Sequence, residues 1–151
     1  MDYWVKYDFE ARIRGILSSI VYKSNPDHHF GRPFLSAYQI AIEYNKLYPN
    51  DVIAMGFVIG GKGVDTNKSL SRYMGSELSK NIKNGIINNI EGCFFSNLDL
   101  KDIIFDYNNN EIVLSAIGGI YDCKRQIGHI FNQCSLYVIM FLVRNLTVFW
   151  Y

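Results

Sequence analysis

The residues best suited to binding a charged ligand lie in the segment 65–83, where we predict a helix. Basic and hydroxyl-bearing side chains recur there at spacings of four, three and four residues, which places them on one helical face. They are Arg72, Ser76, Ser79 and Lys83. Lys68 and Lys80 flank this line, and Glu77 is the only acidic residue between Lys68 and Lys83. Because such side chains contact phosphates and base edges in the DNA major groove, the pattern indicates a nucleic-acid-binding helix.

Glycines near this helix add places where a nucleic-acid backbone could approach. Gly75 lies in the middle of the helix, and Gly61-Lys62-Gly63 precedes it. The stretch 56–62 has the phosphate-loop spacing G-x-x-x-x-G-K, but Gly63 stands where a Ser or Thr would hold Mg²⁺. We therefore expect a turn with Lys62 near a nucleic-acid phosphate, and no nucleotide cofactor.

A second group of candidate residues lies in the stretch Asp27-His28-His29-Phe30-Gly31-Arg32. On a loop, the first three side chains could bind one metal ion and Arg32 could stabilise a phosphate. A metal-activated water would then make the protein a metal-dependent phosphoesterase or nuclease. The same residues could instead only pack and cap a turn, so we favour a protein that is not an enzyme. Further ligands would have to come from Asp51, Asp65, Glu91 or Asp102.

Three amphipathic helices that position these residues are predicted in the first half of the chain. The first spans about 9–21 and ends before Pro26. The second begins near Phe34 or Ser36 and ends at Pro49-Asn50, and the segment 51–59 fits either a buried strand or a short helical connection. The third follows possible N-caps at 65–67 and ends near Lys83. Its apolar stripe is Leu70, Tyr73, Met74, Leu78 and Ile82.

After Gly85, which suits a helix C-terminus, the pattern changes to strands. The segments 103–107 and 111–115 flank three asparagines, which predicts a hairpin with a turn of three residues or slightly more. The segment 86–95 fits another strand. The fold class is therefore α+β, with three N-terminal helices packed against a small hairpin or sheet. A winged helix has this order, with bases contacted by its third helix and the backbone by its hairpin, although the hairpin here begins late.

The last part of the chain has a different composition. Arg144 is the only formal charge in 126–151, and 135–143 is almost continuously apolar. We predict one globular domain over 1–125 and an apolar C-terminal tail over 126–151. The tail fits a buried strand or helix, a membrane anchor or an aberrant end, and its apolar run is shorter than the ~20 residues of a membrane span.

Composition excludes two classes of protein. The chain has 151 residues, 49% hydrophobic and 19% charged, which excludes a disordered chain. Its 15 basic and 14 acidic residues give a net charge of +1, which excludes a wholly basic nucleic-acid binder but allows one basic face. The odd number of cysteines (Cys93, Cys123 and Cys134) and the polar N-terminus predict reduced thiols and a cytoplasmic location.

Three hypotheses about function follow. The leading one is a small prokaryotic DNA-binding protein of helix-turn-helix or winged-helix type; the abundant Asn, Ile and Lys suit a bacterial or mobile-element source. The second is the metal-dependent phosphoesterase or nuclease. The third is a protein-interaction module, or one tethered to a membrane by the apolar tail.

Overall fold

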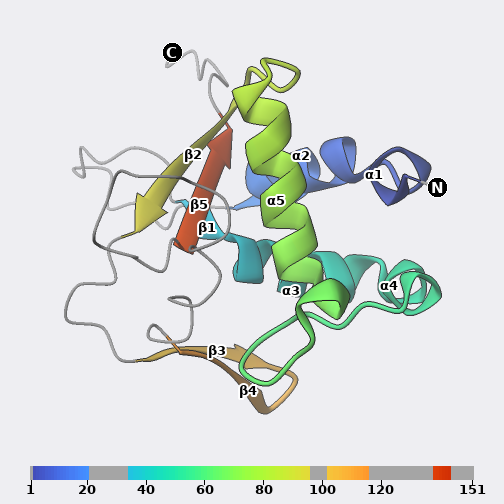
Figure 1. The fold of residues 1–151 in the computed structure, drawn as a ribbon, viewed down its shortest axis with the longest axis vertical. Coiled ribbons are helices and arrows are strands. Elements are labelled where there is room, and N and C mark those ends of the chain that lie inside the picture. The colour runs from blue at the N-terminus through green and yellow to red at the C-terminus, as the bar shows by residue number, and fades with distance from the viewer. Residues whose placement is uncertain (1, 21–33, 96–101, 116–137, 144–151) are drawn as a thin grey trace, which may run out of the picture.

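The computed structural model describes residues 2–20, 34–95, 102–115 and 138–143, and these form a mixed α+β structure. Its helices are α1 (Tyr3–Lys6), α2 (Phe9–Ser19), α3 (Ala37–Leu47), α4 (Pro49–Met55) and α5 (Leu70–Lys83), with a 3₁₀ turn at Thr66–Lys68. Its strands are β1 (Leu35–Ser36), β2 (Ile90–Phe95), β3 (Asp102–Tyr107), β4 (Asn110–Ser115) and β5 (Val138–Val143). Figure 1 shows α5 crossing one side of the molecule, with the β1, β5 and β2 strands beside it.

The three predicted helices are present as α2, α3 and α5, and two short helices accompany them. The segment 51–59, for which sequence left strand and helix open, contributes to α4. Pro49 ends one helix and begins the next, because the first position of a helix does not need the N–H that proline lacks. Gly85 follows α5 with φ +70°, the left-handed conformation expected at a helix C-terminus.

Side-chain caps set the starts of α3 and α5. Ser36 forms a capping box with Gln39, so each residue bonds a free backbone N–H of the other. Asp65, predicted as a cap for the third helix, instead caps the 3₁₀ turn by accepting from the backbone N–H of Asn67 at 2.9 Å. Helix α5 begins later, and its cap is Ser69, whose Oγ accepts from the Arg72 backbone N–H.

The larger sheet joins segments that are far apart in the chain. Its order is β1-β5-β2, and both pairings are antiparallel. Phe141 of β5 is in register with Leu35 on one side and with Gly92 on the other. The six described residues of the predicted apolar tail therefore form the central strand of this sheet.

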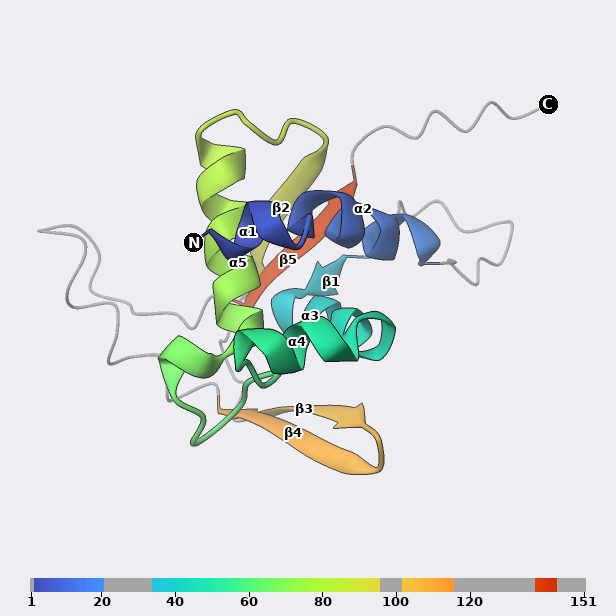
Figure 2. The same cartoon turned by 90° about the vertical axis from the view of Figure 1, so that its right-hand side faces the viewer.

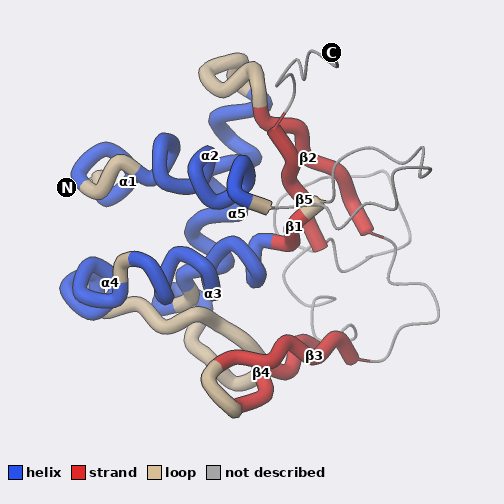
Figure 3. The backbone as a smooth tube through the Cα atoms, turned by 180° about the vertical axis from the view of Figure 1, so that it is seen from behind, coloured by secondary structure: helices blue, strands red, loops and turns tan. Residues whose placement is uncertain are grey.

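The predicted hairpin is present as β3 and β4, with a shorter turn than expected. Only Asn108 and Asn109 form the turn, with φ values of 51° and 60°, and two such residues suit a hairpin whose twist matches its strands. The hairpin packs against α3, where the rings of Phe105 and Tyr38 stack with centroids 5.7 Å apart. It lies on the side of the molecule where the loop before α5 runs (Figures 1 and 3).

The hydrophobic core lies between α2, α3 and α5. The ring of Phe9 stacks on that of Tyr44 with centroids 4.7 Å apart, and both side chains are fully buried. In α5 the predicted apolar stripe is confirmed: Leu70, Met74 and Leu78 are fully buried, and its other two members are partly buried against the core. Figure 2 shows α1 and α2 on one side of this core and α3 and α4 on the other.

Candidate nucleic-acid interface

The outer surface of α5 carries most of the residues that sequence singled out. The helix rotates by about 100° per residue, so the residues opposite its buried stripe form one exposed face. Its exposed members are Arg72, Ser76, Lys80 and Lys83. We call this surface the α5 face. Helix α5 lies in front of the other described helices and strands in Figure 1.

Ser79 also belongs to the α5 face by its position, but its hydroxyl bonds its own helix. The side chain is half-buried, and Oγ donates to the carbonyl oxygen of Gly75 at 2.7 Å. Serine commonly makes this bond one turn back along a helix. A ligand would have to displace the bond before it could use the Ser79 hydroxyl as a donor.

Lys80 forms an ion pair with Glu77, one turn earlier in the same helix. Its Nζ lies 3.5 Å from a carboxylate oxygen of Glu77, and the lysine side chain is 64% exposed. A surface pair of this kind stabilises a helix by only about 0–1 kcal/mol. Lys83, in the last turn, is exposed and lies where a cation favours the negative end of the helix dipole.

Gly75 has a different role from the one that sequence suggested. We expected this glycine to allow a nucleic-acid backbone to come close, and that expectation is wrong. Gly75 is buried, and a Cβ atom placed there would lie 3.3 Å from the Cβ of Ala37 in α3. The missing side chain lets the two helices approach each other, so Gly75 serves packing.

The loop before α5 places two more lysines close to the start of the helix. Backbone bonds close its base, because Val58 donates to the carbonyl of Lys68 at 2.9 Å and accepts from Leu70 at 2.8 Å. Gly60 lies so close to α5 that an added Cβ would be 2.5 Å from the Ser69 Oγ. Lys62 and Lys68 are both exposed, and so is Asp65 between them.

A partly buried tyrosine, Tyr38, lies beneath this end of the α5 face. Burial raises the pKa of Tyr38, while a hydrogen bond with Ser71 and the positive charge of Arg72 oppose that rise. The phenol therefore stays protonated near neutral pH. The positive charge of Arg72 is not neutralised by this neighbour.

The candidate metal ligands are not brought together in the described residues. Asp27, His28, His29 and Arg32 all lie outside the described ranges. Within the described ranges, no group of three or more His, Cys, Asp or Glu side chains is arranged to hold a metal ion. Asp51, one of the further candidates, is instead paired with Arg12.

A polar cluster that no sequence pattern indicated lies between α2, α3 and α4. The Nη1 atom of Arg12 donates to the hydroxyl of Tyr44 at 2.9 Å and to a carboxylate oxygen of Asp51. The guanidinium carbon lies 4.1 Å from the centre of the Tyr48 ring. Burial by itself would lower the pKa of Arg12, but its hydrogen bonds to Asp51 and Tyr44 raise it by more. The pKa therefore lies above its ordinary value, and the arginine stays charged. The partners are 32 and 39 residues from Arg12, and no local pattern marks them.

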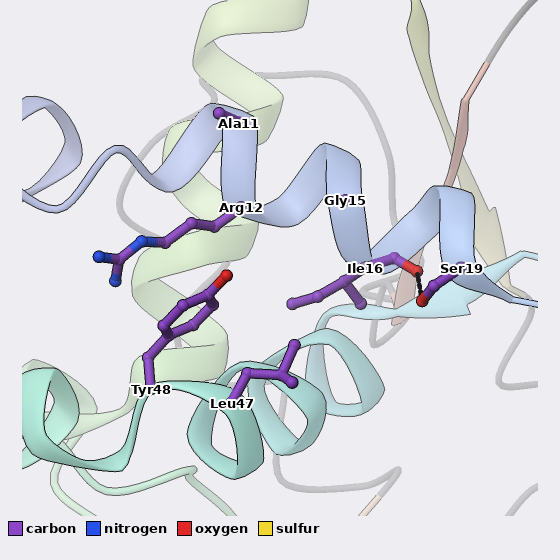
Figure 4. A pocket seen from close by; sticks show the side chains of 7 residues that line it. All are labelled: Ala11, Arg12, Gly15, Ile16, Ser19, Leu47 and Tyr48. Carbon is purple, nitrogen blue, oxygen red and sulfur yellow. Dashed lines mark hydrogen bonds between the residues drawn. The ribbon is translucent and has the colours of Figure 1, made fainter.

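This cluster borders an open groove between α2 and the end of α3 (Figure 4). The groove has a volume of about 410 Å³. Ile16, Leu47 and Tyr48 form its apolar walls, and Gly15 and Ser19 lie along its α2 side. A Cβ atom added at Gly15 would have no neighbour within 4 Å, so the groove is open there.

No known protein family, curated protein or solved structure matches this chain. Among the described residues, no helix combines the length and apolar character that crossing a bilayer requires. Function is therefore inferred from the physical properties of the surfaces described above.

Proposed function

We propose that this chain is a small prokaryotic DNA-binding protein of helix-turn-helix or winged-helix type, and that α5 is its DNA-contacting helix. The observation that carries the proposal is the charge on the α5 face. Arg72, Lys80 and Lys83 are exposed there, and the loop before the helix carries the exposed Lys62 and Lys68 with one exposed acid, Asp65. Lysine and arginine on one surface release counterions when they neutralise phosphates, which favours binding to DNA.

The packing of α5 supports this role because it holds the exposed side chains on a rigid element. The buried side of the helix contacts α3 through the close approach of Gly75 to Ala37. Burial of Leu70, Met74 and Leu78 holds the helix against the core. A binding surface on a packed helix keeps its geometry better than one on a loop.

The order of the elements also supports the proposal. The short strand β1 lies between α2 and α3, β2 follows α5, and β5 lies between β1 and β2 in the sheet. Apart from the short helices α1 and α4 and the inserted hairpin, a winged helix has this order, with its DNA-contacting helix in the place of α5. A shared architecture does not define a function, so the α5 face remains the main argument.

The hairpin β3–β4 is a poor candidate for contacting phosphates. Asp102 and Asp106 are exposed on one face of β3, and Asp106 is in register with Glu111 of β4. The negative charges of Asp102 and Asp106 repel phosphates. The proposal therefore assigns phosphate contacts to the α5 face and its preceding loop, and none to this hairpin.

The test is fluorescence anisotropy with duplex and single-stranded DNA, titrated across salt concentration. Affinity of the full chain should fall steeply with salt, since log K changes by about 0.9 per phosphate contact for each tenfold change in salt. A K80Q/K83Q variant should make the slope of log K against log salt less steep by about the amount expected for 2 lost phosphate contacts. The matched control is K6Q/K46Q, which removes the same charge from exposed lysines of α1 and α3.

The outcomes separate the hypotheses. Absence of binding at low salt, or an equal loss of slope in both double variants, would contradict DNA binding through α5. The metal-dependent phosphoesterase stays a prediction, and it requires Mn²⁺- or Zn²⁺-dependent activity that His28→Ala abolishes. The protein-interaction module also stays a prediction. Deletion of 126–151 would not test it, because Val138–Val143 form the central strand of the larger sheet. The DNA-binding proposal places the protein in the cytoplasm, where a thiol such as Cys93 remains reduced.

A further inference from the structure

We draw no further inference here: the strongest candidate, the open groove of about 410 Å³ between α2 and the end of α3, carries none, because nothing in the described residues shows what covers its apolar walls and the arginine that lines it, Arg12, is already paired with Asp51.

Discussion

The α5 face and the polar cluster between α2 and α4 both contain an arginine, and they use it in opposite ways. Arg12 in the cluster donates to Tyr44 and Asp51, and it lies over the Tyr48 ring. Arg72 lies on an exposed surface that also carries Lys80 and Lys83. The cluster pairs its arginine with a carboxylate from another helix, whereas Arg72, Lys80 and Lys83 lie at an exposed surface.

The difference shows that the fold can enclose an arginine between helices or leave it exposed at the surface. Arg12 and Asp51 come from separate helices that the fold brings together, so the ion pair of Arg12 holds α2 to α4. On α5, by contrast, Lys80 pairs with Glu77 of the same helix, and its Nζ lies 3.5 Å from the carboxylate. Four predictions test this contrast on the stability side, and they run from the largest expected effect to the smallest.

The first prediction concerns the contact that holds the α5 face in place. Gly75→Val should destabilise the protein by about 1–3 kcal/mol, because the new side chain would collide with Ala37. The matched control is Ser76→Val, which adds the same β-branched side chain at an exposed site of the same helix and should cost about 0.5 kcal/mol or less. Urea unfolding measures both. Equal stability of the two variants would show that α5 does not depend on close packing at Gly75.

The second prediction concerns the arginine of the polar cluster. Arg12→Met keeps most of the packing but removes the hydrogen bonds, and it should destabilise the protein by about 1–2 kcal/mol. DNA affinity should change by less than about twofold, since Arg12 lies on α2 rather than on the α5 face and its charge is paired with Asp51, and salt screens what remains. Arg14→Met serves as the control: it breaks only the surface pair with Glu10 and should cost about 0.5 kcal/mol or less. A larger effect of Arg12→Met on DNA affinity than on stability would reverse the contrast.

The third prediction concerns Gly15, on the groove beside the cluster. A Cβ atom there meets nothing within 4 Å, so Gly15→Ala should stabilise α2 by about 0.5–1 kcal/mol. Thermal unfolding measures the gain. Loss of stability would mean that another part of the chain packs against this helix at Gly15.

The fourth prediction uses pH. Burial raises the pKa of Tyr73 to about 12, above its value of 10.0 in the unfolded chain. Between these two pH values the unfolded state has released the phenolic proton and the folded state has kept it, so stability falls as pH rises through the window. Tyr73→Phe should make this fall less steep without abolishing it, because burial also raises the pKa of Tyr38 and Tyr44. Urea unfolding at pH 9 to 11.5 tests the slope, and equal slopes in the two proteins would refute the assignment to Tyr73.

Local features of the chain were predictable because they depend on neighbours in sequence. The buried side of α5 followed from the helical spacing of Leu70, Met74 and Leu78. Its end followed from the glycine at 85, which takes up the positive φ that other residues avoid. The hairpin followed from the tolerance of Asn108 and Asn109 for the same conformation, although the turn is one residue shorter than expected.

The start of α5 was harder to place, since two capping residues lie within five positions of each other. Asp65 and Ser69 both suit a helix N-terminus, and the two differ in tertiary surroundings. The backbone of Val58 bonds Lys68 and Leu70 across the loop, and this pairing determines where the 3₁₀ turn ends and the α-helix begins. A propensity calculated along the chain contains no information about that pairing.

Periodicity and backbone preference determined the helices, the hairpin and the exposed positive charge of α5, because these depend on interactions within a few residues. The fold decided the rest. It placed Val138–Val143 between strands that lie far earlier in the chain, used Gly75 to bring α3 against α5, and engaged Arg12 with partners from other helices. Contacts between residues so far apart depend on which surfaces pack together, and a local pattern of residue types does not encode that choice.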